Sequence, residues 1–216
     1  MTLDRQISIR PALPVLSVVP TLLLLIGLAS AVRAESEPAN DPHAHHRMMA
    51  SSSTIERSTA SYEIPDLTML DQRGERVALM ELFETDRPVM VNFIFTTCTA
   101  ICPMMTSIFQ QVQKRLGDDA EKILMVSVSI DPEHDSPEAL AEYAARFRAG
   151  PQWYFLTGTL EDSIAVQKAF EAYRGDKMNH APLTLLRNHE DGAWIRLDGF
   201  ASADELEREC RAMLGT

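Results

Sequence analysis

The sequence predicts an α/β domain in which a central mixed β-sheet is flanked by helices on both faces. Apolar runs of strand length alternate with helix-like segments from about Ser61 onward. The alternation ends in a strand, a turn and a strand, followed by a last helix, which is typical of a mixed sheet. The 216 residues include only three cysteines, too few for a disulfide scaffold, so we expect an apolar core.

Residues 1–34 have the form of a secretory signal or a membrane anchor. Arg5 and Arg10 precede an apolar run that ends in small residues at Ala34. Uncleaved, the run from Ala12 to Val32 could just span a bilayer core of about 30 Å. Cleavage and anchoring both stay open. Either way we expect an exported domain, which in a bacterium lies at the periplasmic face of the inner membrane.

Residues 35–60 are expected to form a flexible tether, because they are small, polar or charged and have no apolar period. Histidine and methionine are concentrated within seven of them: His43, His45, His46, Met48 and Met49. Imidazole and thioether are suitable copper ligands. The segment is therefore either a copper-collecting tract or a plain polar linker.

The domain itself is expected to occupy residues 61–216. Its strands are predicted from apolar runs and turn residues, at 63–79 (two short strands around an Asp-Gln-Arg-Gly turn), 88–95, 123–130, 153–158, and a hairpin of 182–188 with 193–200. Its helices are predicted from caps and helical spacing, from Pro103 to Leu116, Ser136 to Arg148, Thr159 to Tyr173, and Ser202 onward. Cys210 lies on the apolar face of the last helix, which indicates a packing role.

The stretch FIFTTCTAICPMM, residues 93–105, carries the predicted site. Cys98 ends the loop after a central strand, and Cys102 stands before Pro103 at the expected start of a helix. The helix dipole and the free amide groups there stabilise thiolate over thiol. The spacing suits either a short-loop disulfide or a two-thiolate metal clamp. In an exported protein such a pair indicates a redox or metal device.

A metal site needs a further ligand, and the domain offers His134, His180 and His189. His180 precedes a strand that should run beside the cysteine-bearing one. Two thiolates and an imidazole suit Cu(I), and Cu(II) could add water or a neighbouring oxygen. Zinc can use the same ligands with water. Export and the histidine/methionine tether favour copper.

These residues resemble the Sco (SenC) family over residues 61–214. The family's Cys-x3-Cys-Pro, Asp-Pro-x-x-Asp and metal histidine are matched, in the expected order, by CTAICP, DPEHDSP and NHAPLTLL. The resemblance implies a thioredoxin-like fold, membrane tethering, and copper loading of cytochrome c oxidase. It also implies copper binding by Cys98, Cys102 and His180, with Asp131 in a loop that influences the site.

Two departures from the family lie close to the predicted metal ligands. Many members have Asp where this chain has Thr99, and they often have Asp where it has Asn179. Both changes remove negative charge, so copper affinity and redox poise are expected to differ. His134 occupies a variable position and is a candidate extra ligand.

The sequence leads to two main functional hypotheses. The first is a metallochaperone, not a conventional enzyme, that passes copper to an oxidase subunit or another copper protein. The second is a thiol-disulfide reductase, with Cys98 and Cys102 as the redox-active pair, that keeps a partner's copper-site cysteines reduced and draws on a thiol reductant. His180 is needed only by the first. A copper or redox sensor is a third, weaker hypothesis. The net charge of −11 argues against a nucleic-acid partner.

Overall fold

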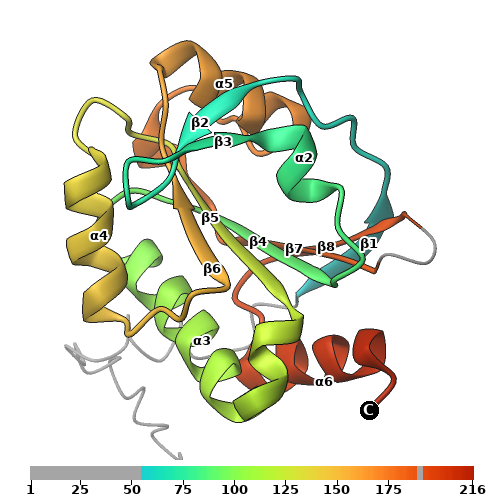
Figure 1. Cartoon of the computed structure of the whole chain (residues 1–216). Coiled ribbons are helices and arrows are strands. Elements are labelled where there is room, and N and C mark those ends of the chain that lie inside the picture. Colours follow the sequence, from blue (N-terminus) through green and yellow to red (C-terminus); the bar gives the residue numbers. More distant parts are fainter. Residues whose placement is uncertain (1–54, 189–191) are drawn as a thin grey trace, which may run out of the picture. The chain divides into compact units, whose positions relative to one another are not determined.

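The computed structural model describes residues 55–188 and 192–216 (Figure 1). Its centre is a six-stranded sheet in the order β1-β8-β7-β4-β5-β6, and β2 pairs with β3 in a separate small sheet. The strands are β1 (Glu56–Ala60), β2 (Thr68–Leu70), β3 (Arg76–Ala78), β4 (Val89–Ile94), β5 (Leu124–Ser129), β6 (Trp153–Leu156), β7 (Leu183–Arg187) and β8 (Trp194–Asp198).

The large sheet is mixed, as predicted. Strands β4, β5 and β6 are parallel, whereas β7 is antiparallel to both β4 and β8. Every residue of β4 and β5 is buried, which explains why both strands read as nearly continuous apolar runs, interrupted only by Asn92, Ser127 and Ser129. Because Asn92 pairs with Thr184 in opposite strand directions, the residues before β7 lie beyond the end of β4. The expected pairing of these strands is confirmed, and it brings the histidine-bearing segment to the cysteine loop.

Helices cover both faces of the sheet (Figure 1). They are α2 (Leu79–Phe83), α3 (Ile101–Leu116), α4 (Pro137–Arg146), α5 (Leu160–Ala169) and α6 (Ala203–Leu214), with the 3₁₀ turns η1 (Gly117–Lys122) and η2 (Lys177–Asn179). Aromatic contacts identify the two faces. Phe83 and Phe170 pack on Trp194 at ring-centroid distances of 5.9 and 5.1 Å, whereas Phe109 of α3 packs on Trp153 at 5.8 Å.

The predicted helix caps are confirmed. Ser136 caps α4, and Thr159 and Ser202 each form a capping box, with Asp162 and Glu205 respectively. Two helices end earlier than predicted, α4 at Arg146 rather than Arg148 and α5 at Ala169 rather than Tyr173. Backbone geometry explains both ends, because Arg148 and Glu171 have φ values of 51° and 53°, in the left-handed region that cannot continue a helix.

The predicted tether ends earlier than residue 60. Residues 56–60 form β1, which pairs antiparallel with β8 along its whole length. Four of its five residues are exposed, so the strand is held by backbone pairing and has no apolar period to reveal it. The leader, the histidine/methionine tract and His189 lie outside the described residues. Within 55–188 and 192–216, no helix combines the length and apolar character needed to cross a membrane.

Candidate metal centre

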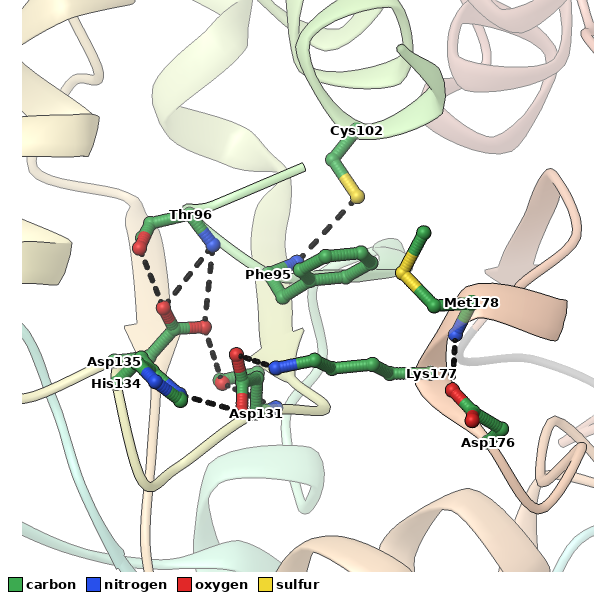
Figure 2. Close-up of polar contacts among 10 residues, drawn as sticks. Phe95, Thr96, Cys102, Asp131, His134, Asp135, Asp176, Lys177 and Met178 are labelled. Carbon is green, nitrogen blue, oxygen red and sulfur yellow. Dashed lines mark hydrogen bonds and ion pairs between the residues drawn. The ribbon is translucent and has the colours of Figure 1, made fainter. Parts of the chain in front are cut away.

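The loop that carries Cys98 is held by a buried carboxylate. The chain turns at Phe95–Thr97 directly after β4. The carboxylate of Asp135 accepts hydrogen bonds from the Thr96 backbone N–H at 3.0 Å, the Thr96 hydroxyl at 2.6 Å and the Ser129 hydroxyl at 2.6 Å (Figure 2). Asp135 is fully buried, so these bonds replace its lost hydration. The end of β4 is thereby joined to the end of β5 and to the loop before α4.

Cys98 and Cys102 are free thiols that lie together at the start of α3. The backbone N–H of Cys102 donates to Cys98 Sγ at 3.4 Å. The backbone N–H of Phe95 donates to Cys102 Sγ at 3.4 Å, as Figure 2 shows. Cys98 is partly exposed, whereas Cys102 is completely buried. These contacts keep the two cysteines together, as either a short-loop disulfide or a two-thiolate metal clamp would require.

The pKa values of the two thiols are shifted in opposite directions. Burial alone would raise the pKa of Cys98, but the backbone N–H groups of Cys102, Ala100 and Ile101 outweigh it and lower that pKa. Burial raises the pKa of Cys102 far above its usual range. The Phe95 N–H opposes this rise, and the neighbouring charges of Cys98 and Asp135 add to it.

The prediction that the helix start favours both thiolates is therefore wrong for Cys102. Helix α3 begins at Ile101, so Cys102 already lies within the first turn and its side chain enters the core. The free N–H groups of that turn point instead at the preceding Cys98.

His180 follows η2 and is partly buried against Phe95. The two rings meet edge to face with their centroids 6.4 Å apart, and the imidazole also hydrogen-bonds the backbone of Phe93. Its Nε2 atom is buried and has no hydrogen-bond partner in the described part of the chain. Burial lowers the pKa of His180, and the charge of Arg174 lowers it further, against the opposing Phe93 bond. A neutral imidazole with one free nitrogen is the form that binds a metal.

The three predicted ligands are not gathered into one cluster. Across residues 55–188 and 192–216, no group of three or more Cys, His, Asp and Glu side chains is placed to hold a metal ion. His180 lines a small cavity together with Arg174 and Asp198. Phe95 connects this cavity to the cysteines, since its ring contacts His180 and its N–H contacts Cys102 Sγ. The ligand role of His180 stays a prediction.

Asp131 joins the histidine-bearing loop to the loop after β5. Its carboxylate is 4% exposed and contacts Lys177 Nζ at 2.5 Å and His134 Nδ1 at 3.1 Å (Figure 2). Burial raises the pKa of Asp131, but the hydrogen bonds from Lys177 and His134 outweigh it, so the pKa is lowered. Lys177 Nζ also lies 5.7 Å from the centre of the Phe95 ring. In this arrangement His134 is directed to Asp131.

Three residues of this centre were missed in the sequence. Asp135 is the second Asp of DPEHDSP, so its place in a recognised motif was a signal that it anchors the site. Lys177 and Arg174 are single basic residues in a polar loop, and nothing in the sequence distinguishes them from solvated lysines and arginines. Only the fold places them beside Asp131 and His180.

The comparison with protein families agrees with this architecture. The family model described as SCO1/SenC matches residues 56–215. The chain belongs to the SCO1/SenC family. The predicted membership, the thioredoxin-like α/β fold and the mixed central sheet are thereby confirmed.

Individual Sco proteins show how far the likeness extends. The SCO1 protein homolog of Bacillus subtilis is 35% identical over 115 residues, which cover 52% of this chain and 58% of that protein. The chain thus spans little more than half the length of this curated relative. The solved structure of BsSco is 28% identical in sequence to this chain. BsSco is described as having a disulfide switch and as a member of the Sco family of cytochrome c oxidase assembly proteins. It has a TM-score of 0.60 and covers 72% of this chain and 95% of its own.

A copper-bound member of the family also has this fold. Bradyrhizobium japonicum ScoI, solved with copper bound, has a TM-score of 0.59 at 23% identity, over 71% of this chain and 99% of its own. At this identity the likeness concerns the fold.

Proposed function

We propose that this chain is a copper-binding metallochaperone that delivers copper during the assembly of a respiratory oxidase. The observation that carries the proposal is the Cys98–Cys102 pair at the start of α3 in a chain of the SCO1/SenC family. A copper-bound structure within the family and the description of BsSco as an oxidase assembly protein support it.

The donor atoms fit copper as a cargo. Cys98 has a lowered pKa, so its thiolate forms more readily than that of an ordinary cysteine, whereas the buried Cys102 must lose its proton when the metal binds. His180 is held neutral, and its Nε2 has no competing partner. Soft thiolates and a neutral imidazole are ligands that copper accepts in both of its common oxidation states.

His180 would have to leave its cavity to join the thiolates. The ring now lies with Arg174 and Asp198, and Phe95 stands in contact with it. The proposed holding state therefore includes a shift of the segment before β7, and the proposed release state is the one described here. This coupling gives a physical route by which the chain binds copper and then gives it up.

A second candidate function is thiol-disulfide exchange, and the opposite pKa shifts of the two cysteines favour it. The Cys98 thiolate would attack a partner's disulfide, forming a mixed disulfide and releasing one partner thiolate. Cys102 would then lose its proton and attack Cys98 Sγ, which releases the second partner thiolate and leaves a Cys98–Cys102 disulfide. A thiol reductant would restore the pair. The disulfide switch described for BsSco supports this candidate.

The proposed site of action is outside the cytoplasm. The leader in residues 1–34 supports export, either as a cleaved signal or as a membrane anchor. The proposed partner is a copper-accepting oxidase subunit or another exported copper protein.

The two candidate functions are separated with a His180→Ala variant and an isolated copper-accepting oxidase domain. Copper transfer is followed with the acceptor's cysteines reduced, and disulfide reduction with them oxidised. The chaperone function predicts that the variant loses the transfer of copper loaded as Cu(II) and keeps disulfide reduction. Transfer at the wild-type rate by His180→Ala would contradict the proposed role of His180.

A further inference from the structure

One methionine stands out on the surface beside the site. Met178 is 75% exposed, more than the other large exposed apolar residues of 55–188 and 192–216, which are Met80, Met104 and Leu160. It lies at the centre of η2, between Lys177 and Asn179 and two residues before His180. An isolated exposed apolar side chain is common and needs no explanation by itself. The surroundings of Met178 are what make it informative.

The segment that carries Met178 is fastened to the cysteine loop on both sides. Lys177, immediately before it, binds Asp131 and lies over the Phe95 ring. His180, two residues after it, contacts the same ring. Phe95 in turn donates its backbone N–H to Cys102 Sγ. Met178 is therefore held next to the residue that touches the buried cysteine.

The backbone also orients Met178. The Asp176 carboxylate accepts a hydrogen bond from the Met178 N–H at 2.8 Å, which caps the short turn. Figure 2 shows the Met178 side chain running past the Phe95 ring toward the side on which Cys102 lies, while Lys177 runs to the opposite side, toward Asp131. Lys177 thus forms the ion pair with Asp131, whereas the side chain of its neighbour Met178 lies on the Cys102 side of the Phe95 ring.

The chemistry at this place suits a soft metal ion. Cys98 and Cys102 supply sulfur, and in this arrangement the imidazole of His180 is in its own cavity. A thioether is a neutral soft ligand that prefers Cu(I) and binds Cu(II) poorly. It needs no deprotonation, and an exposed methionine can rotate without disturbing the core.

We propose that Met178 is a Cu(I) ligand that completes a three-sulfur site with Cys98 and Cys102. This inference rests on the proposed copper-binding function and assigns it a ligand specific to one oxidation state. The proposed site forms without His180, whose ring stays in its own cavity. It is the form that takes up or releases Cu(I), and Cu(II) depends on His180 instead.

The test uses the full reduced chain loaded with one equivalent of Cu(I). Met178→Leu removes the sulfur while keeping an apolar side chain of similar size. Met80→Leu is the matched control, since Met80 is also exposed but lies on α2. Met104→Leu tests the other exposed methionine near the pair, two residues after Cys102. Cu(I) affinity is measured by competition with a chelator, and sulfur ligands are counted by X-ray absorption.

We expect Met178→Leu to weaken Cu(I) binding roughly tenfold and to remove one sulfur from the metal's coordination shell. Met80→Leu and Met104→Leu should match the wild type, and Cu(II) affinity should be unchanged in all three. An unaltered affinity and sulfur count in Met178→Leu would overturn the inference, as would a loss found only in Met104→Leu. If a Cys98→Ser/Cys102→Ser variant also keeps its copper, the proposed function itself fails, and the two failures are thereby distinguished.

Discussion

The backbone N–H of Cys102 points at Cys98 Sγ from 3.4 Å, so one member of the pair stabilises the thiolate of the other. The reverse does not hold, because the Cys102 sulfur is buried and receives its hydrogen bond from Phe95. Two cysteines four residues apart therefore have different chemistry. Cys98 is the partly exposed, more reactive sulfur, whereas Cys102 stays a thiol until a metal or a disulfide bond takes the place of its proton.

Alkylation rates should show this asymmetry directly. In the reduced chain, the rate at which iodoacetamide alkylates Cys98 should rise with pH, and the midpoint of that rise should lie below the ordinary cysteine pKa. The reason is that the surrounding N–H groups stabilise the Cys98 thiolate. Cys102 should remain largely unmodified over the same pH range. Mass spectrometry of peptides from Cys98→Ser and Cys102→Ser variants measures each rate separately. Equal rates for the two cysteines would show that the fold does not distinguish them.

The protonation of His180 should respond to Arg174. Burial and the Arg174 charge lower the His180 pKa, so the ring stays neutral to a more acidic pH than a free histidine. Arg174→Gln should raise that pKa, whereas Arg174→Lys keeps the charge and serves as the control. NMR titration of the His180 ring protons, in the copper-free wild type, Arg174→Gln and Arg174→Lys, gives one pKa midpoint for each protein. A midpoint that does not move in Arg174→Gln would mean that burial alone determines it.

The Asp131–Lys177 ion pair should stabilise the domain. Lys177→Met breaks a contact in which the carboxylate is 4% and the lysine side chain 33% exposed, and should lower the free energy of unfolding at pH 7. Lys122→Met is the control, because the Lys122–Asp119 pair is far more exposed and should contribute little. Urea unfolding measures both variants.

The pH dependence of this effect has a defined sign. The Asp131 pKa is lowered in the folded chain, so the contribution of its carboxylate is present above the unfolded value of about 3.9 and is lost as pH falls through the folded value. The difference between wild type and Lys177→Met should therefore shrink in acid. A difference that stays constant down to pH 2 would exclude the ion pair as its cause.

The sequence predicted what depends on local pattern. The buried strands β4 and β5, the caps at Ser136, Thr159 and Ser202, and the hairpin of β7 and β8 all leave a signal in neighbouring residues. Strand β1 leaves none, because four of its five residues are exposed and it is held mainly by backbone pairing with β8.

The sequence identified candidate residues of the site, but not how they are arranged or how their pKa values are shifted. Cys98 and Cys102 could be named from their spacing and from the family motif, and the pairing of β4 with β7 was expected to bring His180 near. The opposite pKa shifts could not be foreseen, since they depend on α3 beginning one residue before Cys102. The ion pair of Asp131 and Lys177 spans 46 positions, a relation that sequence pattern does not carry.

Cys210 should have no part in metal or redox chemistry. It is fully buried on α6, and burial raises its pKa to about 12, so it remains a thiol. Cys210→Ala should cost about 1 kcal/mol of stability through a small cavity and leave copper binding and disulfide exchange unchanged. Cys210→Ser should cost more, since it buries a hydroxyl without an assured partner. Loss of one bound copper in Cys210→Ala would refute this assignment.

The most direct test of the account is the copper stoichiometry and affinity of the full reduced chain, measured beside a Cys98→Ser/Cys102→Ser variant and His180→Ala. Any copper held by the histidine/methionine tract is common to all three and is subtracted by the comparison. We expect one tightly bound copper that the double cysteine variant loses entirely and that His180→Ala loses as Cu(II). Equal copper binding by the wild type and the double cysteine variant would contradict it.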